Sequence, residues 1–134
     1  MHARSRSRTL GFALALAAGG ALANIDLPPS AADNADAMVA AEALKAEPDN
    51  AHYHNGLGYA YRKAGQLDPS FVHYRTALRL DPELKSAHEY IGEAYLAKGD
   101  KAKAREHLAT LEKLCGGRGC EEYRDLAKAI AAAK

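Results

Sequence analysis

The stretch AHYHNGLGYAYRKAGQLDPSFVHYRTALRLDPEL (51–84) is followed directly by KSAHEYIGEAYLAKGDKAKAREHLATLEKLCGGR (85–118). The two segments have equal length and align without a gap, which places Gly58 opposite Gly92 and Gly65 opposite Gly99. Apolar and aromatic positions in the second half of each segment also coincide. A fixed period of this length is typical of proteins whose units stack into a solenoid.

The first half of each unit has the pattern of an amphipathic helix. In the first unit Tyr53, Leu57 and Tyr61 recur at helical spacing, which predicts one buried face. Gly58 lies on the same face, although glycine inside a helix costs about 1 kcal/mol relative to alanine. We therefore expect this glycine to permit close approach of a neighbouring structural element.

Each unit then contains the signals of a turn and a second helix. Gly65 and Gly99 follow the first helices, where a residue that accepts positive φ commonly ends a helix. In the first unit Asp68 and Pro69 predict the start of the next helix, with Asp68 as the N-cap. Two antiparallel helices per unit follow, and the chain is predicted to be all-α.

The spacing within each unit resembles the tetratricopeptide repeat (TPR) family, in which Leu-Gly and Tyr precede Ala, an aromatic residue and Pro. The first unit carries this pattern as His54, Leu57, Gly58, Tyr61, Ser70, Tyr74 and Pro82. The second unit carries it as His88, Ile91, Gly92, Tyr95, Ala104 and Leu108. The resemblance implies a short right-handed solenoid of antiparallel helix pairs.

The flanks of the two units look like incomplete repeats. Residues 35–50 contain Glu47-Pro48, which matches Asp81-Pro82 at the same offset, and we interpret them as an N-terminal half-repeat. Residues 120–133 repeat the opening pattern of a unit once more and are predicted to form a C-terminal capping helix. The predicted repeat domain thus spans 35–134 and has six helices.

The N-terminus has the layout of a secretory signal peptide. Three arginines precede a short apolar run, and Ala21-Leu22-Ala23 is a small-residue cleavage site, so residues 1–23 are predicted to be removed. An uncleaved form tethered to the membrane is the alternative, although the apolar run is shorter than the ~20 residues that span a bilayer. Residues 24–34 are interpreted as a flexible lead-in. We expect export to a bacterial periplasm, without stable membrane insertion after cleavage.

Removal of the signal peptide changes the charge of the chain. Residues 1–23 contain 3 of the 18 basic residues and none of the 17 acidic residues, so the mature net charge is −2. The chain also lacks a basic stripe with interleaved aromatic residues, which disfavours a nucleic-acid partner.

Cys115 and Cys120 are separated by three glycines and an arginine at the end of the second unit. In an oxidising compartment we expect these cysteines to form a structural disulfide that stabilises a small solenoid. A redox-active pair is the first alternative, but the spacing is not C-x-x-C. A zinc site is the second, and it would need two further ligands.

Four histidines occupy equivalent positions in the two units: His54 matches His88, and His73 matches His107. Repeated histidines suggest a metal site, because imidazole is the commonest metal ligand. Equivalent residues on successive helix pairs, however, lie at helix-packing distances of about 8–10 Å or more. We therefore expect packing rings with one hydrogen-bonded nitrogen, and we predict no metal and no cofactor.

No arrangement of residues indicates an enzyme: the chain has no nucleophile elbow and no phosphate-binding glycine loop. Glu89 and Glu93 lie one helical turn apart and could suggest paired catalytic carboxylates. We interpret them instead as an exposed polar surface, and we predict that the protein is not an enzyme.

The TPR resemblance implies that the first helix of each unit lines a concave groove that binds a peptide or helix of a partner. The positions that it assigns to this groove are His52, Asn55, Tyr59, Arg62, Ser86, Glu89, Glu93, Leu96, Glu121, Arg124 and Lys128. We therefore expect an exported protein-interaction module with a scaffold or assembly role, and homo-oligomerisation stays open. The alternative function is a small metal-binding or thiol-redox accessory protein that uses His88, Glu89, Glu93 or the cysteine pair.

Overall fold

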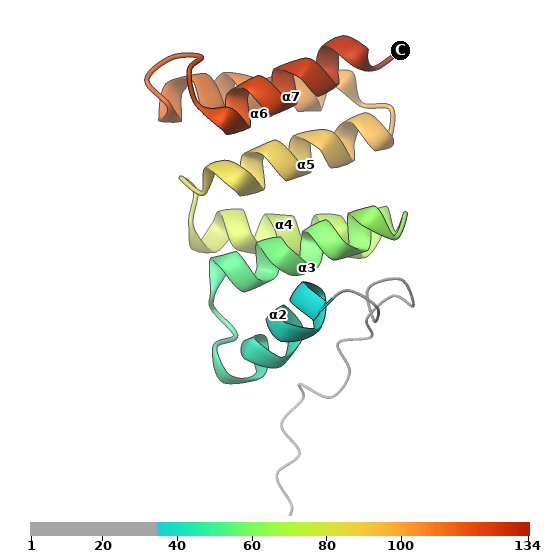
Figure 1. Ribbon diagram of the computed structural model, residues 1–134, viewed down its shortest axis with the longest axis vertical. Helices are drawn as coiled ribbons and strands as arrows, with labels where there is room; N and C mark the ends of the chain where they lie inside the picture. The colour runs from blue at the N-terminus through green and yellow to red at the C-terminus, as the bar shows by residue number, and fades with distance from the viewer. Residues whose placement is uncertain (1–34) are drawn as a thin grey trace, which may run out of the picture.

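The computed structural model describes residues 35–134, and this part of the chain contains six helices and no strands (Figure 1). The helices are α2 (Ala35–Ala46), α3 (Ala51–Lys63), α4 (Leu67–Leu80), α5 (Lys85–Ala97), α6 (Lys101–Leu114) and α7 (Glu121–Ala132). The all-α prediction is confirmed. The predicted signal peptide and lead-in lie outside the described residues.

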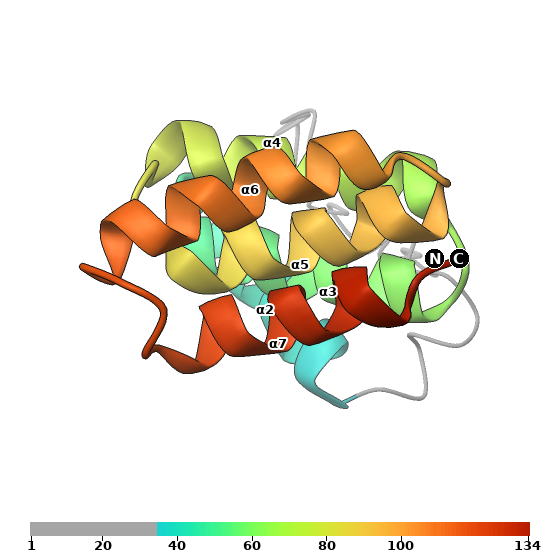
Figure 2. The same cartoon turned by 90° about the horizontal axis from the view of Figure 1, so that it is seen from above.

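The helices stack as pairs along the long axis of the molecule (Figure 1). Helix α3 packs on α4, and α5 packs on α6, which are the two predicted repeat units. Helix α2 packs on α3 at one end, and α7 packs on α5 and α6 at the other. Seen along the stack, α4 and α6 lie on one side of α5 and α7 lies on the other (Figure 2). Helices α3, α5 and α7 therefore form one continuous row.

Glycine ends the first helix of each repeat in the predicted way. Gly65 has φ 76° and Gly99 has φ 86°, both in the left-handed region. After α3, the N–H of Gly65 donates to Arg62 O at 2.9 Å and the N–H of Gln66 donates to Tyr61 O at 2.9 Å. These two bonds form the Schellman arrangement, which satisfies the last carbonyl groups of the helix.

The start of α4 lies earlier in the chain than the sequence predicted. Helix α4 begins at Leu67 with Gln66 as its N-cap, so Asp68 lies in the first turn and is not the cap. The helix can begin this early because a carboxylate in the first turn favours the positive end of the helix dipole. Pro69 is also accepted there, since an N–H in the first turn has no partner within the helix.

Two helical glycines lie where the neighbouring structure leaves no room for a side chain. A Cβ atom at Gly58 would lie 2.6 Å from the ring of Tyr74 on α4. A Cβ atom at Gly92 would lie 2.7 Å from a methyl carbon of Leu126 on α7. The expected close approach is thus confirmed at Gly58, where the partner comes from the same repeat, and Gly92 makes an equivalent approach to the capping helix.

Apolar contacts join the elements in sequence along the stack. Helix α2 packs against α3 through a buried cluster that includes Leu44 and Leu57. The two repeats meet through Phe71 and Ile91, and α7 closes the stack with Leu126, which is fully buried. None of the helices within 35–134 has the length and hydropathy needed to cross a membrane.

Candidate functional site

The histidines form pairs within each repeat. His54 Nε2 lies 2.8 Å from the carbonyl oxygen of Pro48, and His54 Nδ1 lies 3.1 Å from His73 Nδ1. Because a carbonyl oxygen only accepts, Nε2 of His54 carries the proton and donates it. In the neutral ring Nδ1 is then an acceptor, so His73 donates its Nδ1–H to His54. Tyr61 stacks on His73 at 5.5 Å between ring centroids.

The second repeat contains the same arrangement at the equivalent positions. His88 Nε2 donates to Pro82 O at 2.7 Å, and His107 Nδ1 lies 3.0 Å from His88 Nδ1. Tyr95 stacks on His107 at 5.7 Å, as Tyr61 stacks on His73. Sequence reasoning predicted one bonded nitrogen per ring, and both nitrogens of His54 and of His88 are in fact bonded.

Each pair contains one histidine that resists protonation. Burial, and then the neighbouring His54, lower the pKa of His73 from 6.5 to about 4. Burial and His88 lower the pKa of His107 to about 4 in the same way. The pairs therefore favour a neutral state, with a single proton between the facing nitrogens. Sequence reasoning compared equivalent histidines across the units and missed these contacts, although both members of each pair lie within one unit.

The predicted groove residues meet along the row of α3, α5 and α7, which we call the groove face. Arg62 of α3 forms an ion pair with Glu93 of α5, with 2.6 Å between Nη2 and Oε2. The same guanidinium lies 5.3 Å from the ring centre of Tyr59 and 5.8 Å from that of Tyr90. Both partners of the ion pair are largely shielded from solvent, with side chains 16% and 25% exposed. One basic side chain is thus held between a carboxylate and two aromatic rings.

Glu89 was predicted to be exposed beside Glu93, and this prediction is wrong. Glu89 is only 9% exposed because α7 packs on this part of α5. Burial, followed by the carboxylates of Glu93 and Asp125, raises the pKa of Glu89 from 4.5 to about 7. Glu122 and Glu121 of α7 contribute in the same direction. A carboxylate thus lies buried among other carboxylates, and no cation is paired with it in the described part of the chain.

Asn55 occupies the position in the first repeat that Glu89 occupies in the second. It is 7% exposed, and its Nδ2 donates to Ser86 Oγ at 3.1 Å. Its Oδ1 is buried and has no hydrogen-bond partner among residues 35–134. An unpaired buried acceptor costs about 1–3 kcal/mol, so Asn55 is a second strained polar group on the groove face.

A hollow lies between α5 and α7 on the groove face. Its volume is about 360 Å³, and it is lined by Glu93, Asp125, Lys128, Ala129 and Ala132. Two acidic residues and one lysine therefore surround a floor of small apolar side chains. Sequence reasoning assigned Glu93 and Lys128 to the groove but missed Asp125 and the two alanines.

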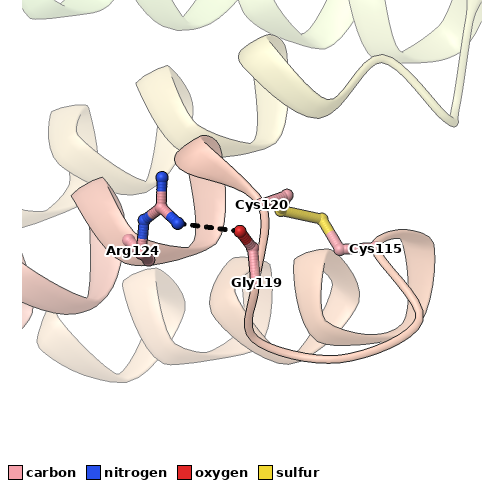
Figure 3. Close-up of a disulfide and its surroundings, with 4 residues drawn as sticks. All are labelled: Cys115, Gly119, Cys120 and Arg124. Atoms are coloured by element: carbon pink, nitrogen blue, oxygen red, sulfur yellow. Dashed lines mark hydrogen bonds between the residues drawn. A yellow bond between two sulfur atoms is a disulfide. The ribbon is translucent and has the colours of Figure 1, made fainter.

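Two of the predicted groove residues also have contacts that stabilise the fold. Leu96 packs against the buried cluster of α6 and α7, where apolar burial explains its position better than ligand contact does. Arg124 Nη1 donates to the carbonyl oxygen of Gly119 at 2.9 Å and closes the turn before α7 (Figure 3). His52 and Glu121 are exposed at the first turns of α3 and α7.

Cys115 and Cys120 are joined by a disulfide at the α6–α7 turn, with 5.9 Å between their Cα atoms (Figure 3). Within residues 35–134, they form with Glu122 the group of three residues close enough to share a metal. Sulfur in a disulfide is not a thiolate and is a poor metal ligand. The other residues of the metal alternative point apart, because His88 faces α6 and Glu89 faces α7.

A stack of antiparallel helix pairs with a fixed sequence period defines a helical repeat protein. Residues 58–99, which run from α3 through α5, match the family model described as TPR repeat, so this part of the chain is a tetratricopeptide repeat. No curated protein matches the chain. Repeats of this family typically act as non-enzymatic scaffolds with protein partners.

Proposed function

We propose that this protein is an exported interaction module that holds a peptide or helix of a partner protein on the groove face. It serves as a scaffold or assembly factor in the bacterial periplasm. The observation that carries the proposal is the hollow between α5 and α7, which combines charged walls with a floor of alanine side chains. Small-residue floors admit a side chain of a ligand, while charged walls select among ligands.

Two further observations support a binding role for this face. Tyr59 and Tyr90 lie half-buried with their ring centres 5.1 Å apart, next to the ion pair of Arg62 and Glu93. Aromatic and arginine side chains dominate the energetics of protein interfaces. The signal-peptide pattern of residues 1–23 and the disulfide of Cys115 and Cys120 both fit an oxidising compartment.

The test is capture of partners by the tagged full chain expressed in a bacterial host, with variants that fill the hollow. Ala132→Trp places a large ring in the hollow, whereas Ala109→Trp places the same ring on the exposed surface of α6. We expect the protein to fractionate with the periplasm and to begin at Asn24 after cleavage. We expect Ala132→Trp to lose at least one captured protein that the wild type and Ala109→Trp retain.

Two results would contradict the proposal. Full-length chain confined to the cytoplasm would remove the export assignment. An identical set of captured proteins for Ala132→Trp and the wild type would show that the hollow takes no part in binding. Circular dichroism of both tryptophan variants checks that the helices remain folded.

A further inference from the structure

The α5–α7 side of the groove face contains more negative charge than its neighbours neutralise. Glu89, Glu121, Glu122 and Asp125 face one another across this region, and none of them has an ion pair within the described residues. Exposed acidic clusters are common on protein surfaces, and such a cluster alone does not define a site. The decisive residue is Glu89, which is nine-tenths buried, faces this cluster and has no ion pair in the part of the chain that the structure describes.

A largely buried carboxyl without a counter-ion is costly to the fold when it carries a charge. Its position among four other carboxylates increases that cost further. A cation that approaches Glu89 and Asp125 would offset both the cost of burying the charge of Glu89 and its repulsion by the other carboxylates. The region therefore has the electrostatic character of a site whose counter-charge comes from outside the chain.

The contact between the two repeats shows which kind of cation this face accommodates. Arg62 lies against the carboxylate of Glu93 and over the rings of Tyr59 and Tyr90. Carboxylate and aromatic faces together favour a guanidinium or an ammonium group. In the second repeat Leu96 occupies the position equivalent to Arg62 and carries no charge. Lys128 lines the hollow, but it forms no ion pair among residues 35–134.

We infer that the groove face binds an extended segment of a partner protein that carries lysine or arginine, with the cationic side chain in the α5–α7 hollow. This inference rests on the proposed function and specifies the chemistry of the ligand. The ammonium or guanidinium group meets Asp125, which lines the hollow and is close enough to Glu89 to raise its pKa, and its aliphatic stem lies along Ala129 and Ala132.

The test uses fluorescence anisotropy of three labelled 12-residue peptides with an alanine–serine backbone and three lysines, three glutamates or no charged residue. We expect the lysine peptide to bind the full chain and the other two to bind at least about 10-fold more weakly, the factor typical of one charge-assisted bond. Glu89→Gln with Asp125→Asn should weaken binding of the lysine peptide by about 10-fold or more. The matched control is Asp68→Asn with Glu106→Gln, which removes the same charge from α4 and α6.

The pH dependence of lysine-peptide binding gives a second readout, which non-specific attraction between net charges would not produce. Because the pKa of Glu89 is raised to about 7, acidification from pH 8 to pH 6 protonates this group and should weaken lysine-peptide binding. The other charged groups near it are Glu93, Asp125, Glu121, Glu122, Arg62 and Lys128. In Glu89→Gln this pH dependence should disappear.

The outcomes separate this inference from the proposed function. Equal binding of the neutral and lysine peptides, abolished by Ala132→Trp, would overturn the basic ligand and leave the groove intact. If Asp68→Asn with Glu106→Gln weakens lysine-peptide binding equally, the attraction depends only on net charge, and the inference is overturned. Salt-sensitive dimers that compete with the peptide would assign the site to a second copy of this chain. Failure of the proposed function would be seen in a different experiment, the capture of partner proteins with Ala132→Trp and Ala109→Trp.

Discussion

The two repeats are alike on the side of α4 and α6 and different on the groove face. His54 and His73 in the first repeat, and His88 and His107 in the second, form the same hydrogen-bonded pair. On the groove face the matching positions differ in chemistry: Asn55 corresponds to Glu89, Tyr59 to Glu93 and Arg62 to Leu96. The histidine contacts therefore repeat, while these positions of the groove face diverge. This divergence supports our proposal that the groove face is the binding surface.

The largest expected effect comes from removal of the shared histidine contacts. His73→Phe with His107→Phe keeps both rings but leaves the Nδ1 acceptors of His54 and His88 without donors. Each orphaned acceptor costs about 1–3 kcal/mol, so for two acceptors we expect a loss of roughly 2–6 kcal/mol in the free energy of unfolding at pH 7.5. Urea denaturation followed by circular dichroism measures this loss. If the two repeats are equivalent, His73→Phe and His107→Phe should each lower the free energy of unfolding by a similar amount.

The same variant should change how stability depends on pH. The pKa of His73 and of His107 is lowered to about 4 in the folded chain, so both contribute stability above pH 6.5 that is lost as pH falls toward 4. Glu89 acts oppositely, because its raised pKa disfavours the fold as pH rises from 4.5 through 7. The difference in stability between the wild type and the double variant therefore isolates the histidines, and it should shrink below pH 6.5. A constant difference would contradict the pairing.

The next effect tests a feature that only the second repeat has. Cys115→Ser with Cys120→Ser removes the disulfide and should lower the free energy of unfolding by about 2 kcal/mol, the chain-entropy value for so short a loop. For a domain of this size the melting temperature should fall by roughly 8–16 °C. Reduction of the wild type should give the same shift, and a smaller shift would mean that the turn is held by Arg124 and Gly119.

The smallest effect compares the two helical glycines. Gly58→Ala forces the buried ring of Tyr74 to move, so overpacking outweighs the gain in helix propensity and we expect destabilisation by about 1–2 kcal/mol. Gly92→Ala meets only the flexible methyl groups of Leu126, and the change should stay within about 1 kcal/mol. Thermal melts of the two variants give the ranking, and a larger loss at Gly92 would reverse our view of the α7 contact.

The repeat pattern was enough to predict the fold, because a gapless period constrains every unit at once. Most helix boundaries, the positive φ of Gly65 and Gly99, and the close approach at Gly58 all follow from local spacing and backbone chemistry. The contact of Gly92 with Leu126 could not be predicted in this way. This contact depends on how the capping helix α7 packs on α5, and the fixed offset between the two repeats carries no information about that packing.

The site was less predictable than the fold for a related reason. Helical spacing indicates which face of α5 Glu89 occupies, but burial depends on how closely α7 approaches that face. The ion pair of Arg62 and Glu93 joins different repeats, and the repeat period does not align these two positions. Contacts between successive units are the ones that a repeat alignment leaves unspecified.

The capping helix also limits how a molecule of this kind can lengthen. Leu126 fills the space over Gly92 in place of a further repeat, and the disulfide fixes α7 at the end of the stack. A duplicated unit can therefore enter only between α2 and α7, in steps of one whole repeat. Each step would extend the row of first helices by one helix spacing of about 8–10 Å while both ends stay unchanged. The length of the groove face can therefore change only by whole repeats.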